Sequence, residues 1–170
     1  MQIKLMVDEQ EAQLGCEGLE SLVCSLPDWD ESFAKVFHKL AQSNIAGVRA
    51  AVAGKRVISE ETVANLASDS SPEVIDALVS EQRCKISESA LAQIIQRNWS
   101  KVNRDIARYV EDYNQSDITE VAKLLAGSAD PSVRAALASN GRAPKHIVRQ
   151  LLKDPDPDVR RLAQDILKGG

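Results

Sequence analysis

Three cysteines and two histidines are the residues of this chain best suited to hold a metal ion. Cys16, Cys24, Cys84, His38 and His146 are widely separated along the sequence. Zinc and iron-sulfur sites usually take four ligands in close pairs such as C-x-x-C, and the sequence has no such pair. An odd number of scattered cysteines also gives no disulfide framework. We therefore expect no metal site and no cofactor, with buried structural thiols and ordinary surface imidazoles.

The acidic pairs and the glycines suggest no catalytic centre either. Glu60 and Glu61, like Glu111 and Asp112, fit helix starts and solvated turns better than a catalytic cleft. The stretches "AGSAD" and "GKR" hold single glycines without the strand-turn-helix context that aims backbone N–H groups at a phosphate. The sequence therefore predicts a protein that is not an enzyme.

Three arginines, Arg49, Arg134 and Arg160, each follow a valine and have the charge needed to contact a nucleic-acid backbone. A structural interpretation competes with this one. Asp130 and Asp156 lie three residues before the valines of the last two arginines, so Asp–Arg pairing between neighbouring repeats would account for both residue types. A net charge of −4 and a pI near 5.3 also disfavour a dedicated nucleic-acid-binding protein. We favour the structural interpretation.

The arginines belong to a phrase that recurs along the chain. "ADPSVRAALA" and "DPDPDVRRLA" both run from an acidic residue through proline to Val-Arg and then to small apolar residues. The valine of this phrase recurs every 26 to 31 residues, at Val48, Val74, Val102, Val133 and Val159. An apolar residue follows four positions after each of the first four valines, which is the spacing of a short amphipathic helix.

We call the helices that carry these valines the valine helices. A second helix is expected between each valine helix and the next. These segments begin at Ile58, Ile86, Ser116 and Ala143. Ser59, Ser87 and Asp117 are suited to cap the first three. The spacing from each second helix to the next valine helix is 11 or 12 residues. The spacing from each valine helix to the second helix that follows it varies from 15 to 19 residues. Insertions therefore collect in one loop, as expected for stacked helical pairs.

The predicted architecture is a single all-α domain over residues 1–170, an α-solenoid of about five helical-pair repeats with a terminal capping helix. Residues 1–16 form an N-terminal cap or an extended segment, and 17–43 form a degenerate repeat. Within that repeat, one apolar face is expected from Phe33, Val36, Phe37 and Leu40. The later repeats cover 46–67, 72–97, 100–127 and 131–153, and the capping helix covers 157–168. An aromatic content of only 4% suits closely packed helices of Ala, Val, Leu and Ile.

The stretch "ADPSVRAALASNGRAPKHIVRQLLKDPDPDVRRLAQDIL", residues 129–167, resembles the variant leucine-rich repeat and, more loosely, HEAT-like helical repeats. The resemblance is weaker over 46–128, where Ile75 and Asn103 replace the arginine. It implies a right-handed superhelix of paired short helices without strands. Members of the variant family can carry a cysteine-rich iron-sulfur segment, but this chain has no equivalent cluster, so the resemblance adds no cofactor.

The expected function is a non-catalytic protein-interaction or scaffold module, with another protein as its partner. The alternatives are a HEAT-like nucleic-acid-binding protein and a regulatory subunit of an enzyme. The charge balance is −5 over 1–45, −3 over 46–130 and +4 over 131–170, which would suit head-to-tail self-association or a partner with complementary ends. No apolar run approaches the roughly 20 residues that cross a bilayer, and the first residues lack a signal-peptide pattern. We therefore expect a cytoplasmic protein without a membrane role.

Two surfaces are candidates for the partner. Trp99, Tyr109 and Tyr113 lie in the repeat with the longest loop, and exposed rings favour interfaces. Filling of the space in a longer repeat is the competing and favoured explanation for Trp99 and Tyr109. The second surface follows one equivalent position of the second helices, occupied by Lys39, Asn65, Gln93, Lys123 and Gln150.

Overall fold

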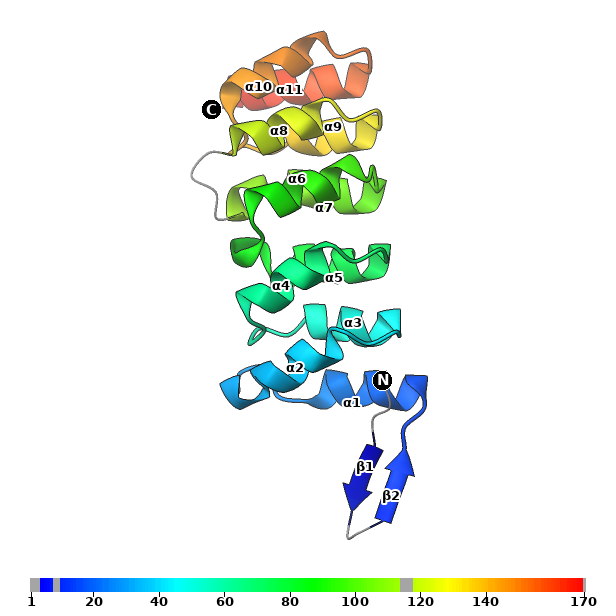
Figure 1. Ribbon diagram of the computed structural model, residues 1–170. Helices are drawn as coiled ribbons and strands as arrows, with labels where there is room; N and C mark the ends of the chain where they lie inside the picture. The colour runs from blue at the N-terminus through cyan, green and yellow to red at the C-terminus, as the bar shows by residue number, and fades with distance from the viewer. Residues whose placement is uncertain (1–3, 8–9, 114–117, 170) are drawn as a thin grey trace. The chain divides into compact units, whose positions relative to one another are not determined.

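The structure, a computed structural model, describes residues 4–7, 10–113 and 118–169 (Figure 1). From Cys16 onward its regular elements are helices, so the expected all-α class is confirmed there, and one β-hairpin precedes them. The contacts divide the chain into two compact units, residues 1–82 and 83–170. The expectation of one domain over 1–170 remains a prediction.

Where the structure describes it, the first unit contains the hairpin and five α-helices. Strands β1 (Lys4–Val7) and β2 (Gln10–Gln13) are antiparallel, with Lys4 opposite Gln13 and Val7 opposite Gln10. The helices are α1 (Cys16–Ser25), α2 (Ala34–Leu40), α3 (Ala46–Ala53), α4 (Glu60–Ala67) and α5 (Pro72–Glu81), with a 3-10 turn at Glu31–Phe33. An extended N-terminal segment was expected, but its pairing with a second strand was not.

The described residues of the second unit form six α-helices. They are α6 (Glu88–Gln96), α7 (Ser100–Arg108), α8 (Thr119–Ala126), α9 (Pro131–Ala138), α10 (Lys145–Gln150) and α11 (Pro157–Gly169). Short 3-10 turns lie at Arg83–Lys85, Val110–Asp112 and Leu151–Lys153. The last helix agrees with the predicted capping helix to within one residue.

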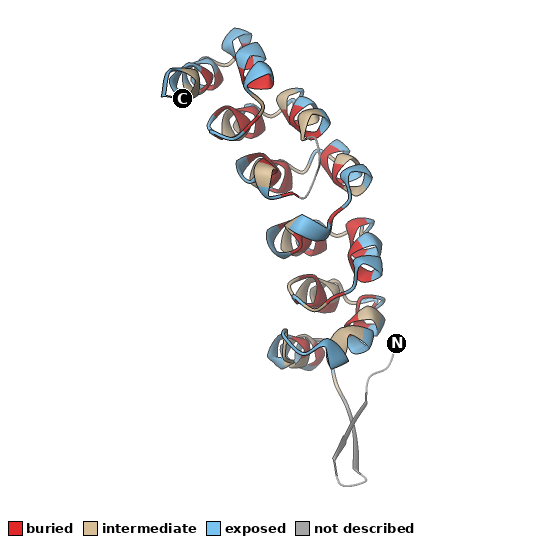
Figure 2. Cartoon of the chain, turned by 90° about the vertical axis from the view of Figure 1, so that its left-hand side faces the viewer, coloured by how far each residue is buried: buried red, intermediate tan, exposed pale blue. Residues whose placement is uncertain are grey.

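Helices from successive pairs pack against one another inside each unit. In the first unit α3 contacts both α1 and α5, and α4 packs on α3 and α5. In the second unit α9 contacts α7 and α11, while α8 contacts α6 and α10. Figure 2 shows the buried residues turned toward these neighbouring helices within each unit. Each short helix therefore buries its apolar side against its neighbours in place of a single large core.

The valine positions form the core, as their spacing predicts. Val48, Val74, Val102, Val133 and Val159 are all at most 2% exposed. The second helices contribute Val63, Leu91, Val121 and Val148, each at most 1% exposed. The apolar face predicted for α2 is wrong at one position: Phe37 and Leu40 are buried, but Val36 is 45% exposed.

Local signals start several of these helices. The hydroxyls of Ser59 and Ser87 accept hydrogen bonds from the amides of Thr62 and Ala90, which confirms both predicted N-caps. Proline is the first residue of α5, α9 and α11, where its missing N–H is not needed. The third predicted cap, Asp117, lies outside the described residues.

Candidate interaction surface

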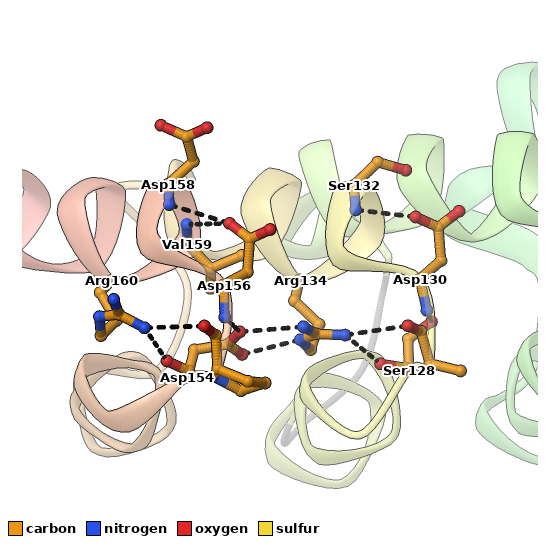
Figure 3. A network of polar contacts seen from close by, with 11 residues as sticks. Ser128, Asp130, Ser132, Arg134, Asp154, Asp156, Asp158, Val159 and Arg160 are labelled. Carbon is orange, nitrogen blue, oxygen red and sulfur yellow. Dashed lines mark hydrogen bonds and ion pairs between the residues drawn. The ribbon is translucent and has the colours of Figure 1, made fainter.

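Arg134 is held by a buried network in the second unit (Figure 3). Its guanidinium donates to both carboxylate oxygens of Asp154, with Nε–Oδ2 at 2.7 Å and Nη2–Oδ1 at 2.9 Å. Nη1 also donates to the carbonyl oxygen of Ser128 at 2.7 Å. The Arg134 hydrogen bond holds the pKa of the Asp154 carboxyl below its usual value. With both side chains buried, this arginine is a structural group and is not available to a ligand.

Arg49 makes the same contacts in the first unit. It donates to both oxygens of Asp69, at 2.5 and 3.0 Å, and to the carbonyl oxygen of Ser43 at 2.8 Å. The carboxylate stands 20 residues after the arginine in both units, and the carbonyl stands six residues before it. Arg160 keeps the carbonyl contact, through the oxygen of Asp154.

The partners of these arginines correct the predicted pairing with Asp130 and Asp156. Asp130 accepts a hydrogen bond from the Ser132 amide at 2.8 Å, and Asp156 accepts one from the Asp158 amide at 2.9 Å. Both carboxylates therefore cap the start of a valine helix, because free backbone N–H groups lie directly above them there. A hydrogen bond from the Ser100 hydroxyl also lowers the pKa of the Asp130 carboxyl.

A second set of buried polar side chains satisfies carbonyls at the ends of valine helices. Lys55 is 6% exposed, and its Nζ donates to the carbonyl oxygens of Cys24 and Leu26 at 2.8 and 2.7 Å. The amide of Gln82 donates in turn to the Lys55 carbonyl at 2.8 Å. Lys55 thus satisfies carbonyl groups at the end of α1, and Gln82 satisfies one after the end of α3. Both side chains are therefore already used by contacts within the fold.

Asn140 has this role in the second unit. Its Nδ2 lies 3.2 Å from the Ala107 carbonyl oxygen, 3.0 Å from that of Arg108 and 2.7 Å from Glu111 Oε2. Lys55, Gln82 and Asn140 were not predicted from the sequence. The signal present there was a polar residue one or two positions after the end of α3, α5 and α9.

The five equivalent positions of the second helices all face solvent. The residues concerned, Lys39 and Asn65 in the first unit and Gln93, Lys123 and Gln150 in the second, are exposed. Lys123 forms a 2.5 Å ion pair with Glu120 on its own helix. None of the five side chains is used by the core, so each is accessible to a partner.

The aromatic candidates separate into exposed and buried residues. Tyr113 is 2% exposed, so its assignment to the binding surface was wrong. Trp99 is half-buried at the start of α7, and the Arg97 guanidinium lies 5.1 Å from its ring centroid. Tyr109 is 42% exposed and keeps the accessibility expected of an interface residue.

Arg83 contacts both Tyr109 and Tyr113. It forms a 3.0 Å ion pair with Asp112, lies 4.0 Å from the Tyr109 ring centroid and hydrogen-bonds with the Tyr113 side chain. Burial raises the pKa of the Tyr113 hydroxyl, with the nearby Arg83 charge acting in the opposite direction. Arg83 thus packs against two tyrosines in the long connection after α7. Of these two rings, only that of Tyr109 has a substantial exposed surface.

Two exposed features were not identified from the sequence. Trp29 is 77% exposed in the turn before α2, and Leu152 is 40% exposed after α10. Around Leu152 the segment 141–153, "GRAPKHIVRQLLK", contains four lysines and arginines and no acidic residue. That run of one charge sign was the sequence signal for this surface.

The thiols and imidazoles offer no metal centre in the described residues, where no three metal-binding side chains gather. Cys24 and Cys84 are free and exposed, so the expectation of buried thiols was wrong for both. His146 is exposed as expected, whereas His38 is half-buried, with Nδ1 2.9 Å from the Thr62 hydroxyl. The side chain of Cys16 lies outside the described residues.

An open depression of about 640 Å³ runs along α1. It is lined by Glu17, Glu20, Ser21, Cys24 and Ser25. All five residues come from the same helix, and Glu17 and Glu20 make the surface of the depression acidic.

Comparison with protein-family models, with curated proteins and with solved structures finds no match for this chain. In the parts of the chain that the structure describes, no helix has the length and apolar character to cross a bilayer.

Proposed function

We propose that this protein is a non-catalytic helical-repeat module that binds another protein. The proposed architecture is a right-handed α-solenoid of about five helical pairs, of the variant leucine-rich repeat or HEAT-like kind, closed by α11. Its support is the regular geometry within each unit, where valine helices pack in succession and each unit has an arginine paired with the aspartate 20 residues after it. A protein whose core is made by repeated positions can vary its surface without disturbing the fold.

The observation that carries the proposal is the exposed row of polar residues on the second helices. Gln93 and Gln150 are exposed, while Leu91 and Val148, two residues before each of them, are buried. The polar side chains therefore add nothing to the core. Such an accessible polar face can change its residues to recognise a protein surface without disturbing the core.

A cytoplasmic location belongs to the same proposal. Cys24 and Cys84 are exposed free thiols, which persist in a reducing compartment and are readily oxidised outside it. The number of cysteines is also odd.

Affinity capture from the native host tests the binding proposal. The bait is the full chain, compared with a double variant Gln93→Arg/Gln150→Arg and with the control Ser139→Arg, which places the same charge on an exposed residue of the other helix layer. We expect one protein in stoichiometric amount with the wild type and the control, and its loss with the double variant. Failure of the wild type to retain any protein would contradict the proposal.

A nucleic-acid-binding function is the second candidate, because the lysines and arginines of segment 141–153 are exposed. Binding of duplex DNA with a steep salt dependence, lost on Lys145→Glu, would favour this candidate over the first. If the captured protein is an enzyme whose activity changes on binding, the module is a regulatory subunit.

A further inference from the structure

The segment around α10 presents a strip of exposed basic residues. The strip consists of Arg142, Lys145, His146, Arg149, Leu152 and Lys153, all of which are exposed. Ile147 and Val148 point the other way, into the core. Lys145, His146 and Arg149 lie on the exposed side of α10, while Arg142 lies in the turn before the helix and Leu152 and Lys153 in the 3-10 turn after it. Within the described part of the chain, its four lysines and arginines form no ion pair.

Local helix stability does not explain this arrangement. Lys145 and Arg149 are like charges four residues apart on α10, and like charges at this spacing repel one another on a helix. The helix dipole favours cations at the C-terminal end, which accounts for Arg149 and Lys153. It disfavours them at the N-terminal end, where Arg142 and Lys145 stand. An anionic partner would relieve both unfavourable effects.

The first unit carries a feature of opposite charge. In the turn before α2, Trp29 is 77% exposed, and the acidic residues Asp30 and Glu31 beside it are exposed as well. The third acidic neighbour, Asp28, is half-buried and lies 3.7 Å from Arg56. The Asp30 carboxylate accepts a hydrogen bond from the Ser32 amide at 2.9 Å, and hydrogen bonds from the Ser32 side chain and from this amide lower the carboxyl pKa. The turn is therefore an exposed indole next to stable negative charge.

We propose that the Trp29 turn of one copy docks on the α10 strip of a second copy. In this contact the indole covers Leu152 and the guanidinium of Arg149, and Asp30 and Glu31 face the remaining basic side chains. An apolar centre with a charged rim is the usual composition of a protein interface. The inference rests on the proposed protein-binding function and names a partner for it.

The whole charge distribution favours a second copy over another anionic partner. The first unit has 14 acidic and six basic residues, and the second has 11 acidic and 15 basic residues. Opposite net charges steer the first unit of one molecule toward the second unit of another. A nucleic acid would neutralise the positive charge of the strip. It would not cover the exposed Trp29 ring, however, and the negative charge of the first unit would repel it.

Sedimentation velocity of the full chain over a range of concentrations tests the inference. We expect the sedimentation coefficient to rise with concentration at low salt and to rise less at high salt, because the rim contacts are ionic. A wild type that stays monomeric at every concentration would overturn the proposal.

Two single variants locate the contact. Trp29→Ala removes the indole and Arg149→Glu reverses a charge in the strip; both side chains are exposed, so folding should be retained and is checked by thermal unfolding. Each variant alone should associate at least about tenfold more weakly than the wild type, the typical loss at an interface anchor. Lys168→Glu, with the same charge change on an exposed residue outside the strip, should associate like the wild type.

Mixing the two variants gives the decisive result. Each retains one intact half of the contact, so an equimolar mixture should form a dimer with one Trp29 turn on one strip, at the wild-type affinity for a single contact. A mixture that remains monomeric would refute head-to-tail docking, as would unchanged association in both variants. Binding of a duplex oligonucleotide by a monomeric wild type would assign the strip to nucleic acid instead.

The capture experiment separates this inference from the proposed function. Suppose the full chain never self-associates but captures a protein, and this capture is lost in the Gln93 and Gln150 variant. The docking of a second copy is then refuted and the protein-binding function stands. If the chain neither self-associates nor captures a protein, both proposals are refuted.

Discussion

Arg134 and Asp154 form a bidentate ion pair between two successive helical pairs, with side chains only 10% and 4% exposed. The arginine belongs to α9, and the aspartate precedes α11, so the pair fixes the spacing of two packed helices. The Asp154 carboxylate also accepts a hydrogen bond from the Asp156 amide at 2.9 Å, which shapes the turn before α11. One carboxylate therefore joins two helices and a turn.

Removal of the arginine should be strongly destabilising. Arg134→Met keeps much of the volume but leaves Asp154 as an uncompensated buried charge, so we expect the free energy of unfolding to fall by about 3–5 kcal/mol. Arg160→Met is the matched control, because Arg160 is exposed and bonds only to carbonyl oxygens, and should cost about 1 kcal/mol. Urea unfolding measures both. Equal losses for the two variants would show that the buried pair has no special role.

The same carboxylate should make stability depend on acid pH. Its pKa is lowered in the folded protein, chiefly by the Arg134 hydrogen bond, so it stabilises the fold above the unfolded value of about 4 and loses this effect as pH falls through the folded pKa. Asp154→Asn should be less stable than the wild type at neutral pH, and the two curves should converge below about pH 4. Unfolding free energies measured from pH 7 down to pH 2 test this. Parallel curves would contradict it.

The valine helices were predictable because their signal is local. A valine with an apolar residue four positions later indicates the buried side of a helix. Ser59 and Ser87 indicate where a helix starts, because each bonds to a backbone amide within four residues of itself. The partner of Arg134 was predicted wrongly because two aspartates, Asp130 and Asp154, stand close enough to it in the repeat to be its ion-pair partner. Only the packed structure shows that the first is committed to its own helix.

The surface was harder to predict than the core. Tyr113 and Tyr109 are four residues apart on the same connection, yet one is buried and the other exposed, and Arg83 from an earlier turn contacts both. The surroundings of the two rings thus include a long-range contact that periodicity does not contain. The basic strip, by contrast, was visible as a run of one charge sign in 141–153.

A test of the helix-end contacts uses Asn140. Asn140→Ala leaves the carbonyl oxygens of Ala107 and Arg108 without their buried donor, so we expect a loss of about 1–3 kcal/mol in unfolding free energy. Ser139→Ala, at the neighbouring exposed position, removes only a hydrogen bond within α9 and should cost less than about 1 kcal/mol. Chemical denaturation of the two variants gives the comparison. A loss as small for Asn140→Ala as for Ser139→Ala would mean that water replaces the amide.

The final prediction concerns α11 as the cover of the second unit. Val159 and Ala163 are fully buried against α9 and α10, whereas Arg160, Arg161, Gln164 and Asp165 are exposed, as expected of a cap. Ending the chain at Lys153 should uncover the apolar sides of these two helices, lower the melting temperature and cause aggregation.

A point variant keeps this test informative if the truncated chain does not fold. Val159→Ala should lower the unfolding free energy by about 1–3 kcal/mol through loss of buried methyl groups. The control Arg161→Ala, on the exposed side of the same helix, should change it by less than about 1 kcal/mol, since its ion pairs with Asp158 and Asp165 are solvent-exposed. Light scattering and thermal unfolding follow both effects. A truncated protein that stays monomeric with an unchanged melting temperature would show that the unit is complete without α11.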